Sequence, residues 1–284
     1  MKSQATRAWG GEAIGAVFTD LDGTLLDRET YRWTAARPAL DILRRRCIPL
    51  VIVTSKAAAE VWPLVRALAR REPLVVENGG AIIFPTRYFP FTIAGARPLR
   101  RGWHEVILGA PRRRLITALA RAARRAQVCV RGFNDMSARE VAELTSLSLE
   151  ESRRALERQC DEPFLVLDRK PAAAWRRLRR EIRRLGFTAT RGTRLFHITA
   201  SDKGAGVRRV VQWFRRAGVV SATVGLGDSP NDIPLLRTVD LAIVVAGAGG
   251  RYDAETLAAV PKARRAGGAG PVGWNRSILE LLSG

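Results

Sequence analysis

The stretch that most constrains this fold is a short apolar run that ends in two carboxylates. Residues 16–19 predict a buried β-strand, and Asp20 and Asp22 follow it at once. Gly23 then favours a turn, so both carboxylates project from the carboxyl end of the strand. Open α/β sheets keep their chemistry at that end. Because two close carboxylates repel each other, the pair indicates a hard metal ion such as Mg²⁺ and an anionic substrate.

Three interpretations of this pair compete. A calcium-binding loop needs Gly at its sixth position and Glu at its twelfth. Counted from Asp20, these positions are Leu25 and Tyr31, so this interpretation fails. In the second, the carboxylates only cap the helix that follows. In the third, Asp20 attacks phosphorus and forms an aspartyl-phosphate. The pair alone leaves the last two interpretations open.

The composition predicts a globular protein of the cytoplasm. The chain has 284 residues, enough for one large domain or two smaller ones, and 46% of them are hydrophobic. No apolar run approaches the roughly 18 residues of a membrane helix, and residues 1–12 lack the apolar segment of a secretory signal. Cys47, Cys129 and Cys160 are widely spaced, which argues against a disulfide framework or a structural zinc. The two histidines exclude a His-rich metal site.

The most unusual bulk property is a formal net charge of +21. A charge of this size is typical of proteins that bind nucleic acids or anionic membranes. A solvated helix face explains it better, because an apolar stripe at helical spacing, Trp175, Leu178, Ile182 and Leu185, lies among arginines. These are Arg176, Arg177, Arg179, Arg180, Arg183 and Arg184. No nucleic-acid-binding motif accompanies the charge, so we expect no specific nucleic-acid partner and no membrane partner.

Further apolar runs repeat the strand pattern along the chain. They predict strands over 48–53, 73–76, 195–199, 221–226 and 241–245, with helices over 37–46, 57–70 and 205–217. Glu77–Gly80 predicts a tight turn that leads into a strand over 81–84. Residues 267–273 are rich in glycine with no strand before them, which predicts a mobile loop.

Polar residues follow several of these strands. Thr54, Ser55 and Lys56 carry donors suited to phosphate oxygens, although the two hydroxyls could simply cap the next helix. Gly227–Asp232 is a second group of acids at a strand's carboxyl end.

Between about residues 91 and 194 the pattern changes. Strand-like pieces over 103–108, 164–167 and 187–190 alternate with Arg-rich helices. Ser137 with Glu140, and Ser148 with Glu151, form capping boxes that begin two of these helices. We therefore expect a core domain over 1–90 and 195–284, interrupted by an α+β module over 91–194.

Taken together, the motifs resemble those of the haloacid-dehalogenase-type phosphatases. Asp20–Thr24, Thr54, Lys203 and Gly227–Asp232 match the four motifs of that family in order. The insertion lies between the second and third motifs, where the type-2 caps of the family lie. The resemblance implies an α/β fold, a Rossmann-like doubly wound parallel sheet with an inserted α+β cap domain. With all four motifs present, simple capping no longer explains Asp20.

One branch of the family, the mannosyl-3-phosphoglycerate phosphatases, resembles this chain more specifically. Thr54–Lys56 stands where many capped relatives have Thr-Gly-Arg, and residues 77–82 also resemble the branch. So do the cap segments 132–136, 140–145 and 162–164. Because cap residues select the leaving group, the resemblance implies that the partner is a small phosphorylated glycoside.

The resemblance also implies roles for the motif residues. Asp20 is the nucleophile, and it holds one Mg²⁺ together with Asp228 and the main-chain carbonyl of Asp22. Asp22 is the general acid and then the general base. Asp232 orients metal-bound water. The residues expected to contact the phosphoryl group or the rest of the substrate are Thr54, Ser55, Lys56, Asn78, Gly79, Lys203, Asn231 and Arg158.

Several alternatives stay open at this point. Lys56 meets the glycerate carboxylate or is a surface helix lysine. The substrate could carry a glucosyl group or be another sugar phosphate, and a phosphomannomutase would share the same core. A nucleic-acid-binding protein that uses the Arg-rich surface is the alternative from another class. The oligomeric state is not predicted.

Overall fold

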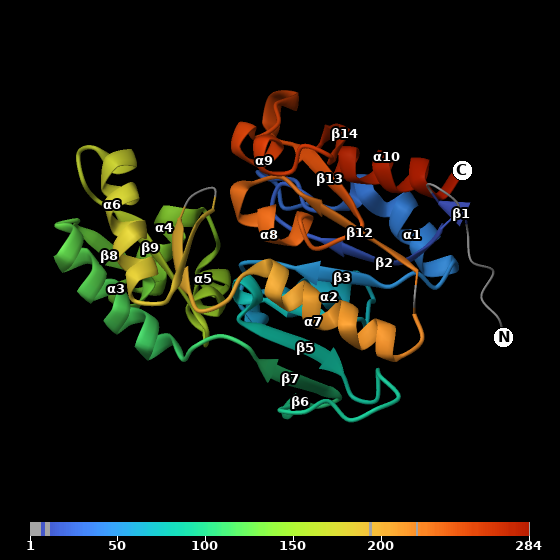
Figure 1. The fold of residues 1–284 in the computed structure, drawn as a ribbon, viewed down its shortest axis with the longest axis horizontal. Coiled ribbons are helices and arrows are strands. Elements are labelled where there is room, and N and C mark those ends of the chain that lie inside the picture. The colour runs from blue at the N-terminus through green and yellow to red at the C-terminus, as the bar shows by residue number, and fades with distance from the viewer. Residues whose placement is uncertain (1–6, 9–11, 193–194, 220, 284) are drawn as a thin grey trace.

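The computed structural model describes residues 7–8, 12–192, 195–219 and 221–283. Within them lie a ten-stranded mixed sheet and a four-stranded antiparallel sheet, side by side along the long axis of the molecule (Figure 1). The helices surround both sheets. The α/β class and the Rossmann-like core with an inserted α+β unit are thereby confirmed.

The larger sheet has the strand order β14-β13-β12-β2-β3-β4-β5-β7-β6, and β1 pairs with β2. From β14 through β4 the neighbours are parallel, whereas β5, β7 and β6 continue the sheet antiparallel. Its strands are β1 (Arg7–Ala8), β2 (Glu12–Thr19), β3 (Leu50–Val53), β4 (Leu74–Val76), β5 (Ala81–Pro85), β6 (Arg97–Arg100), β7 (Trp103–Ile107), β12 (Ala222–Gly227), β13 (Leu241–Ala246) and β14 (Arg264–Ala269).

Helices cover both faces of this sheet because its central strands are apolar on both sides. Val17 of β2 packs with α1 (Arg37–Arg45), α2 (Ala58–Ala67) and α10 (Gly270–Ser283), whereas the next residue, Phe18, packs with α7 (Lys203–Arg216) on the opposite face. Two short helices, α8 (Ile233–Leu236) and α9 (Ala254–Ala259), complete the described part of this unit.

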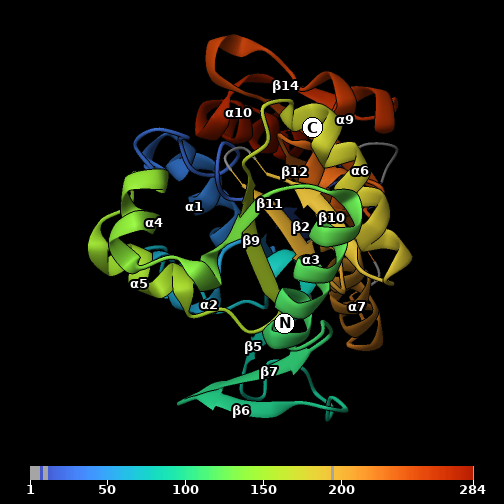
Figure 2. The same cartoon turned by 90° about the vertical axis from the view of Figure 1, so that its left-hand side faces the viewer.

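The smaller sheet has the order β10-β11-β9-β8. Its strands are β8 (Val130–Gly132), β9 (Asp161–Val166), β10 (Thr188–Arg191) and β11 (Phe196–Thr199). Its helices are α3 (Arg112–Ala126), α4 (Ala138–Thr145), α5 (Leu149–Leu156) and α6 (Pro171–Arg184). Figure 2 views this unit end on, with α4 and α5 apart from α3 and α6. Leu178 and Ile182 of α6 are buried against α3, as the apolar stripe predicts.

The boundaries between the two units differ from those expected at residues 90/91 and 194/195. The strand expected over 103–108 forms, but β7 pairs with β5 in the larger sheet. The strand expected over 195–199 also forms, but β11 pairs with β9 and β10 in the smaller one. Residue 194 itself lies outside the described residues. Local sequence patterns indicate that a strand forms but not which strand it pairs with. By the observed pairing, the inserted unit runs from α3 to β11.

The two capping boxes are confirmed, since Ser137 and Ser148 accept the backbone N–H of Glu140 and Glu151. The expected turn between β4 and β5 forms as a short 3-10 turn, η2 (Glu77–Gly79), in which Glu77 and Asn78 have positive φ angles of 51° and 55°. Asn tolerates this conformation better than most residues.

The glycine-rich stretch over 267–273 is not the expected loop. It contains the end of β14, which pairs in parallel with β13, and the start of α10. Its glycines let the strand pass directly into the helix, because a Cβ at Gly273 would lie 2.1 Å from the carbonyl oxygen of Gly268. The sequence pattern does not predict this strand, because Arg264 and Arg265 interrupt any apolar run.

No helix in the described ranges is both long enough and apolar enough to span a membrane.

The strand-to-helix junction gives a test of the fold. Gly273→Ala is expected to lower the free energy of unfolding by about 1–3 kcal/mol, since the backbone of Gly268 must move to admit the methyl group. Gly247→Ala is the matched control, because its Cβ would meet only the Arg251 carbonyl oxygen, at 3.6 Å. Urea unfolding followed by circular dichroism measures both. Equal stability of the two variants would contradict the close approach.

Candidate active site

The site lies where three neighbouring parallel strands end. β2 lies between β12 and β3, so the residues that follow these strands meet at one edge of the sheet. Asp20 follows β2, and its N–H donates to the Leu226 carbonyl of β12 at 3.0 Å. Asp228 follows β12, and Thr54 follows β3. The sequence motifs therefore converge as expected.

Lys203 links the nucleophile candidate to the second acidic motif. Its Nζ donates to Oδ1 of Asp20 at 2.5 Å and to Oδ1 of Asp232 at 2.6 Å. Lys203 is the first residue of α7 and is 1% exposed. Burial works against its charge, but the carboxylates of Asp20 and Asp232 outweigh burial and raise the pKa of Lys203. The ammonium group thus stays charged and fixes both carboxylates.

Three carboxylates form a group that could hold a metal ion. One oxygen each of Asp20, Asp228 and Asp232 lies within 4.8 Å of the others. Burial, and then repulsion from Asp232, raises the pKa of Asp20, and the same two causes raise that of Asp228 to about 7. A cation would relieve this cost, and an all-oxygen set suits a hard one.

Asp228 has two partners that the sequence did not predict. Arg28 forms an ion pair with its Oδ2, and the Thr24 hydroxyl donates to Oδ1 at 3.3 Å. Arg28 stands eight residues after Asp20 in a loop, where no periodic pattern marks it.

Asp22 lies outside the group of three carboxylates. Its Oδ1 is buried without a hydrogen-bond partner among the described residues, and its Oδ2 lies 3.1 Å from Nζ of Lys56. Burial opposes the charge on Lys56, but Asp22 and Glu60 raise its pKa. A central cavity is lined by residues of both the larger-sheet unit and the inserted unit, and Lys56 is one of them. Lys56 is therefore not a surface lysine.

Of the other residues expected to contact the substrate, two line the cavity and two are buried residues that hydrogen-bond to cavity-lining residues. Ser55 and Asn231 line the cavity. Thr54 is 1% exposed, and its hydroxyl accepts the N–H of Lys56 at 3.1 Å. Asn78 is fully buried and accepts a hydrogen bond from Asn231 at 2.9 Å.

Gly79 lies behind the site, against the main chain that precedes Lys203. A Cβ there would lie 1.9 Å from the carbonyl oxygen of Asp202. Gly79 therefore supports the start of α7 by close packing and is not among the cavity-lining residues.

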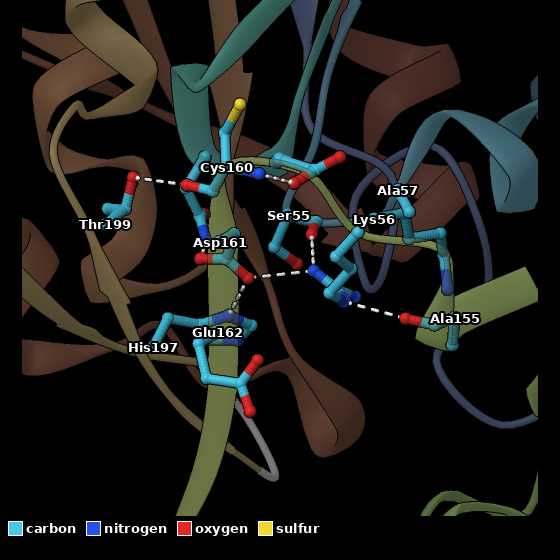
Figure 3. Close-up of polar contacts among 12 residues, drawn as sticks. Ser55, Lys56, Ala57, Ala155, Cys160, Asp161, Glu162, His197 and Thr199 are labelled. Atoms are coloured by element: carbon cyan, nitrogen blue, oxygen red, sulfur yellow. Dashed lines mark hydrogen bonds and ion pairs between the residues drawn. The ribbon is translucent and has the colours of Figure 1, made fainter. Parts of the chain in front are cut away.

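Arg158 connects the inserted unit to the larger sheet. Its Nη1 donates to the Ser55 carbonyl oxygen and to Oδ2 of Asp161, both at 2.8 Å, and Nη2 lies 3.1 Å from Glu60. Arg158 lines the cavity, but these protein partners occupy its guanidinium group. Figure 3 shows this group of contacts around Asp161.

The central cavity has two unlike sides. The larger-sheet unit contributes charged groups, among them Asp20, Asp22, Lys56 and Lys203. The inserted unit contributes four apolar side chains, Phe133, Leu147, Ala155 and Leu195, together with Gly192 and the polar or charged side chains of Thr145, Arg158 and His197. Sequence reasoning missed Glu60 and His197. A lone glutamate or histidine carries no motif, although Glu60 stands three residues after Ala57, the N-cap of α2, whose N–H it accepts at 2.7 Å.

The sequence and the fold both have known relatives. Residues 17–92 match the family of haloacid dehalogenase-like hydrolases. A protein of Methanococcoides burtonii is 36% identical over 268 residues, which cover 94% of this chain and 96% of that protein. One of Persephonella marina is 37% identical over 270 residues, covering 94% and 97%. Each is named a glucosyl-3-phosphoglycerate/mannosyl-3-phosphoglycerate phosphatase.

Solved structures share the fold at low sequence identity. A Thermoplasma acidophilum protein superposes with a TM-score of 0.66 at 15% identity, covering 94% of this chain and 98% of that one. The sucrose-phosphatase of Synechocystis, solved with sucrose and phosphate, gives 0.61 at 14%, with the same coverage of 94% and 98%. The family match, the identity over nearly the full length and the assembled motifs agree, and the chain belongs to the haloacid dehalogenase-like hydrolases, among their phosphatases.

Proposed function

We propose that this phosphatase hydrolyses mannosyl-3-phosphoglycerate to mannosylglycerate and phosphate, with Mg²⁺, through an aspartyl-phosphate. The observation that carries the proposal is the pairing of Asp20 with Lys203 beside Asp22 at the end of β2. The two relatives named for mannosyl- and glucosyl-3-phosphoglycerate support this substrate class and make the glucosyl compound the second candidate.

Asp20 has the position of a nucleophile. Lys203 holds its carboxylate through Oδ1, and the cavity opens over it. In the first step a carboxylate oxygen forms a bond to phosphorus while the bond between phosphorus and the glycerate oxygen breaks. Lys203 and the donors of Thr54 and Ser55 hold the phosphoryl oxygens, which gather negative charge as the bonds change.

Asp22 moves the protons. Its Oδ1, which has no partner among the described residues, donates a proton to the departing glycerate oxygen. The same carboxylate then takes a proton from the water that hydrolyses the aspartyl-phosphate. One group serves both steps because they run in opposite proton directions. Lys56, at 3.1 Å, orients Asp22 and adds positive charge where the glycerate carboxylate lies.

The carboxylates of Asp20 and Asp228 and the main-chain carbonyl of Asp22 would hold the Mg²⁺, and Asp232 would orient a water ligand. When bound, the ion supplies positive charge that offsets the repulsion between the attacking carboxylate and the phosphate.

The inserted unit, from α3 to β11, is proposed to act as the cap that selects the leaving group. The support is that it contributes Phe133, Leu147, Ala155 and Leu195 to the cavity, whereas Asp20 and Lys203, where the phosphate is placed, come from the larger-sheet unit.

Replacement of the nucleophile gives the first test of this chemistry. Asp20→Asn keeps the side-chain volume but removes the attacking oxygen anion, so phosphate release is expected to fall to background while the circular dichroism spectrum persists. Asp41→Asn, at a partly exposed carboxylate on α1, is the control and is expected to behave as wild type. Normal turnover by Asp20→Asn would refute the nucleophile assignment.

Replacement of the proton carrier is expected to act on rate. Asp22→Asn cannot donate or accept the proton, so kcat for mannosyl-3-phosphoglycerate should fall by roughly 10²–10⁴-fold. Steady-state phosphate release measures it. A rate within twofold of wild type would remove Asp22 from proton transfer.

The substrate and the metal are tested together. Phosphate release is measured from mannosyl-3-phosphoglycerate, glucosyl-3-phosphoglycerate and common sugar phosphates, each with Mg²⁺ and with EDTA. We expect Mg²⁺-dependent release chiefly from the two glycosyl-phosphoglycerates. Release only from the other sugar phosphates would refute the proposed substrate, and equal release in EDTA would refute the metal requirement.

A further inference from the structure

His197 is a buried side chain of β11 whose two ring nitrogens have different surroundings. The residue is 5% exposed, and its Nδ1 lies 2.9 Å from Oδ2 of Asp161 on the neighbouring strand β9 (Figure 3). Its Nε2 makes no hydrogen bond to any described residue, yet His197 lines the central cavity. Among the described residues, Nδ1 therefore has a protein partner and Nε2 has none.

Asp161 decides which nitrogen carries the proton. The carboxylate is fully buried and also accepts hydrogen bonds from Arg158 at 2.8 Å and from Asn78 at 3.0 Å. Its ion pair with the guanidinium of Arg158 keeps Asp161 ionised. An ionised carboxylate only accepts hydrogen bonds, so Nδ1 of His197 must donate. In the neutral ring the lone pair then lies on Nε2.

The residue beside Nε2 has no side chain to cover it. Gly192 also lines the cavity, and a Cβ at this position would come into van der Waals contact with Nε2, at 3.4 Å. Leu195 and Phe133 line the same side of the cavity. Lys203 and Asp20, where the phosphoryl group is placed, belong to the larger-sheet unit instead.

We propose that Nε2 of His197 accepts a hydrogen bond from a hydroxyl of the sugar and thereby favours glycosylated substrates. The inference rests on the proposed function, since it assigns the sugar end of that substrate. A lone pair attracts a hydroxyl and repels a carboxylate, so the glycerate carboxylate belongs with Lys56 and Arg28 on the charged side. Apolar neighbours suit the carbon face of a sugar ring.

The test compares three phosphate esters that differ beyond the phosphate. Mannosyl-3-phosphoglycerate has a sugar and a carboxylate, 3-phosphoglycerate has only the carboxylate, and p-nitrophenyl phosphate has neither. His197→Asn removes Nε2 but keeps an amide that can donate to Asp161 in place of Nδ1. kcat and KM are measured for each ester with wild type and variant.

We expect His197→Asn to lower kcat/KM for mannosyl-3-phosphoglycerate at least tenfold more than kcat/KM for 3-phosphoglycerate, as loss of one hydrogen bond to the sugar requires. His104→Asn is the matched control, because this other histidine lies on β7 and contacts the Thr86 hydroxyl at 3.2 Å. It is expected to leave all three values as in wild type.

Three results would overturn the proposal. A loss shared equally by the three esters would show that His197 supports the fold or the phosphoryl centre. A loss for both phosphoglycerates, but not for p-nitrophenyl phosphate, would place the carboxylate at Nε2. No loss for any ester would show that Nε2 meets no part of the substrate. If the wild-type enzyme is inactive on mannosyl-3-phosphoglycerate, the proposed function is refuted instead. The kcat/KM of wild type and of His197→Asn are then compared for the sugar phosphate that the wild type does hydrolyse.

Discussion

The interaction on which the site depends is the buried ammonium of Lys203 between two carboxylates. Asp20 and Asp232 come from different strand ends, and burial raises the free energy of each charge. Without a cation between them, the strand ends could not hold ionised carboxylates side by side. Because Lys203 begins α7, the position of that helix determines the geometry of the site.

Hydrogen bonds around this centre join the two units. Glu77, in the turn between β4 and β5, accepts the N–H groups of Gln159 and Cys160 at 2.9 and 2.6 Å. Burial raises the pKa of Glu77 to about 7. Asn78, next in the chain, connects Asn231 of the acidic loop to Asp161 of β9. Through these hydrogen bonds the turn connects the acidic motif Gly227–Asp232 to β9, whose Asp161 orients His197.

The sequence predicted the charged side of the site well, for a physical reason. Parallel strands bring their carboxyl ends to one edge, so residues such as Asp20, Thr54 and Asp228 could be placed together from local patterns alone. Strand pairing is nonlocal, and this is why β7 and β11 were assigned to the wrong sheets. The same limit hid Arg28 and His197, whose partners Asp228 and Asp161 are distant in sequence. The glycine junction before α10 was missed because close backbone packing leaves no hydrophobic period.

The connection between β11 and α7 is short. β11 ends at Thr199 and α7 begins at Lys203, so only residues 200–202 separate the strand that carries His197 from the helix that carries the lysine. A chain segment spans at most about 3.3–3.6 Å per residue, which gives this connection little slack. A rotation of the inserted unit that exceeds this slack must pull on the first turn of α7. The same rotation would then open the cavity and weaken the hydrogen bond from Lys203 to Asp20.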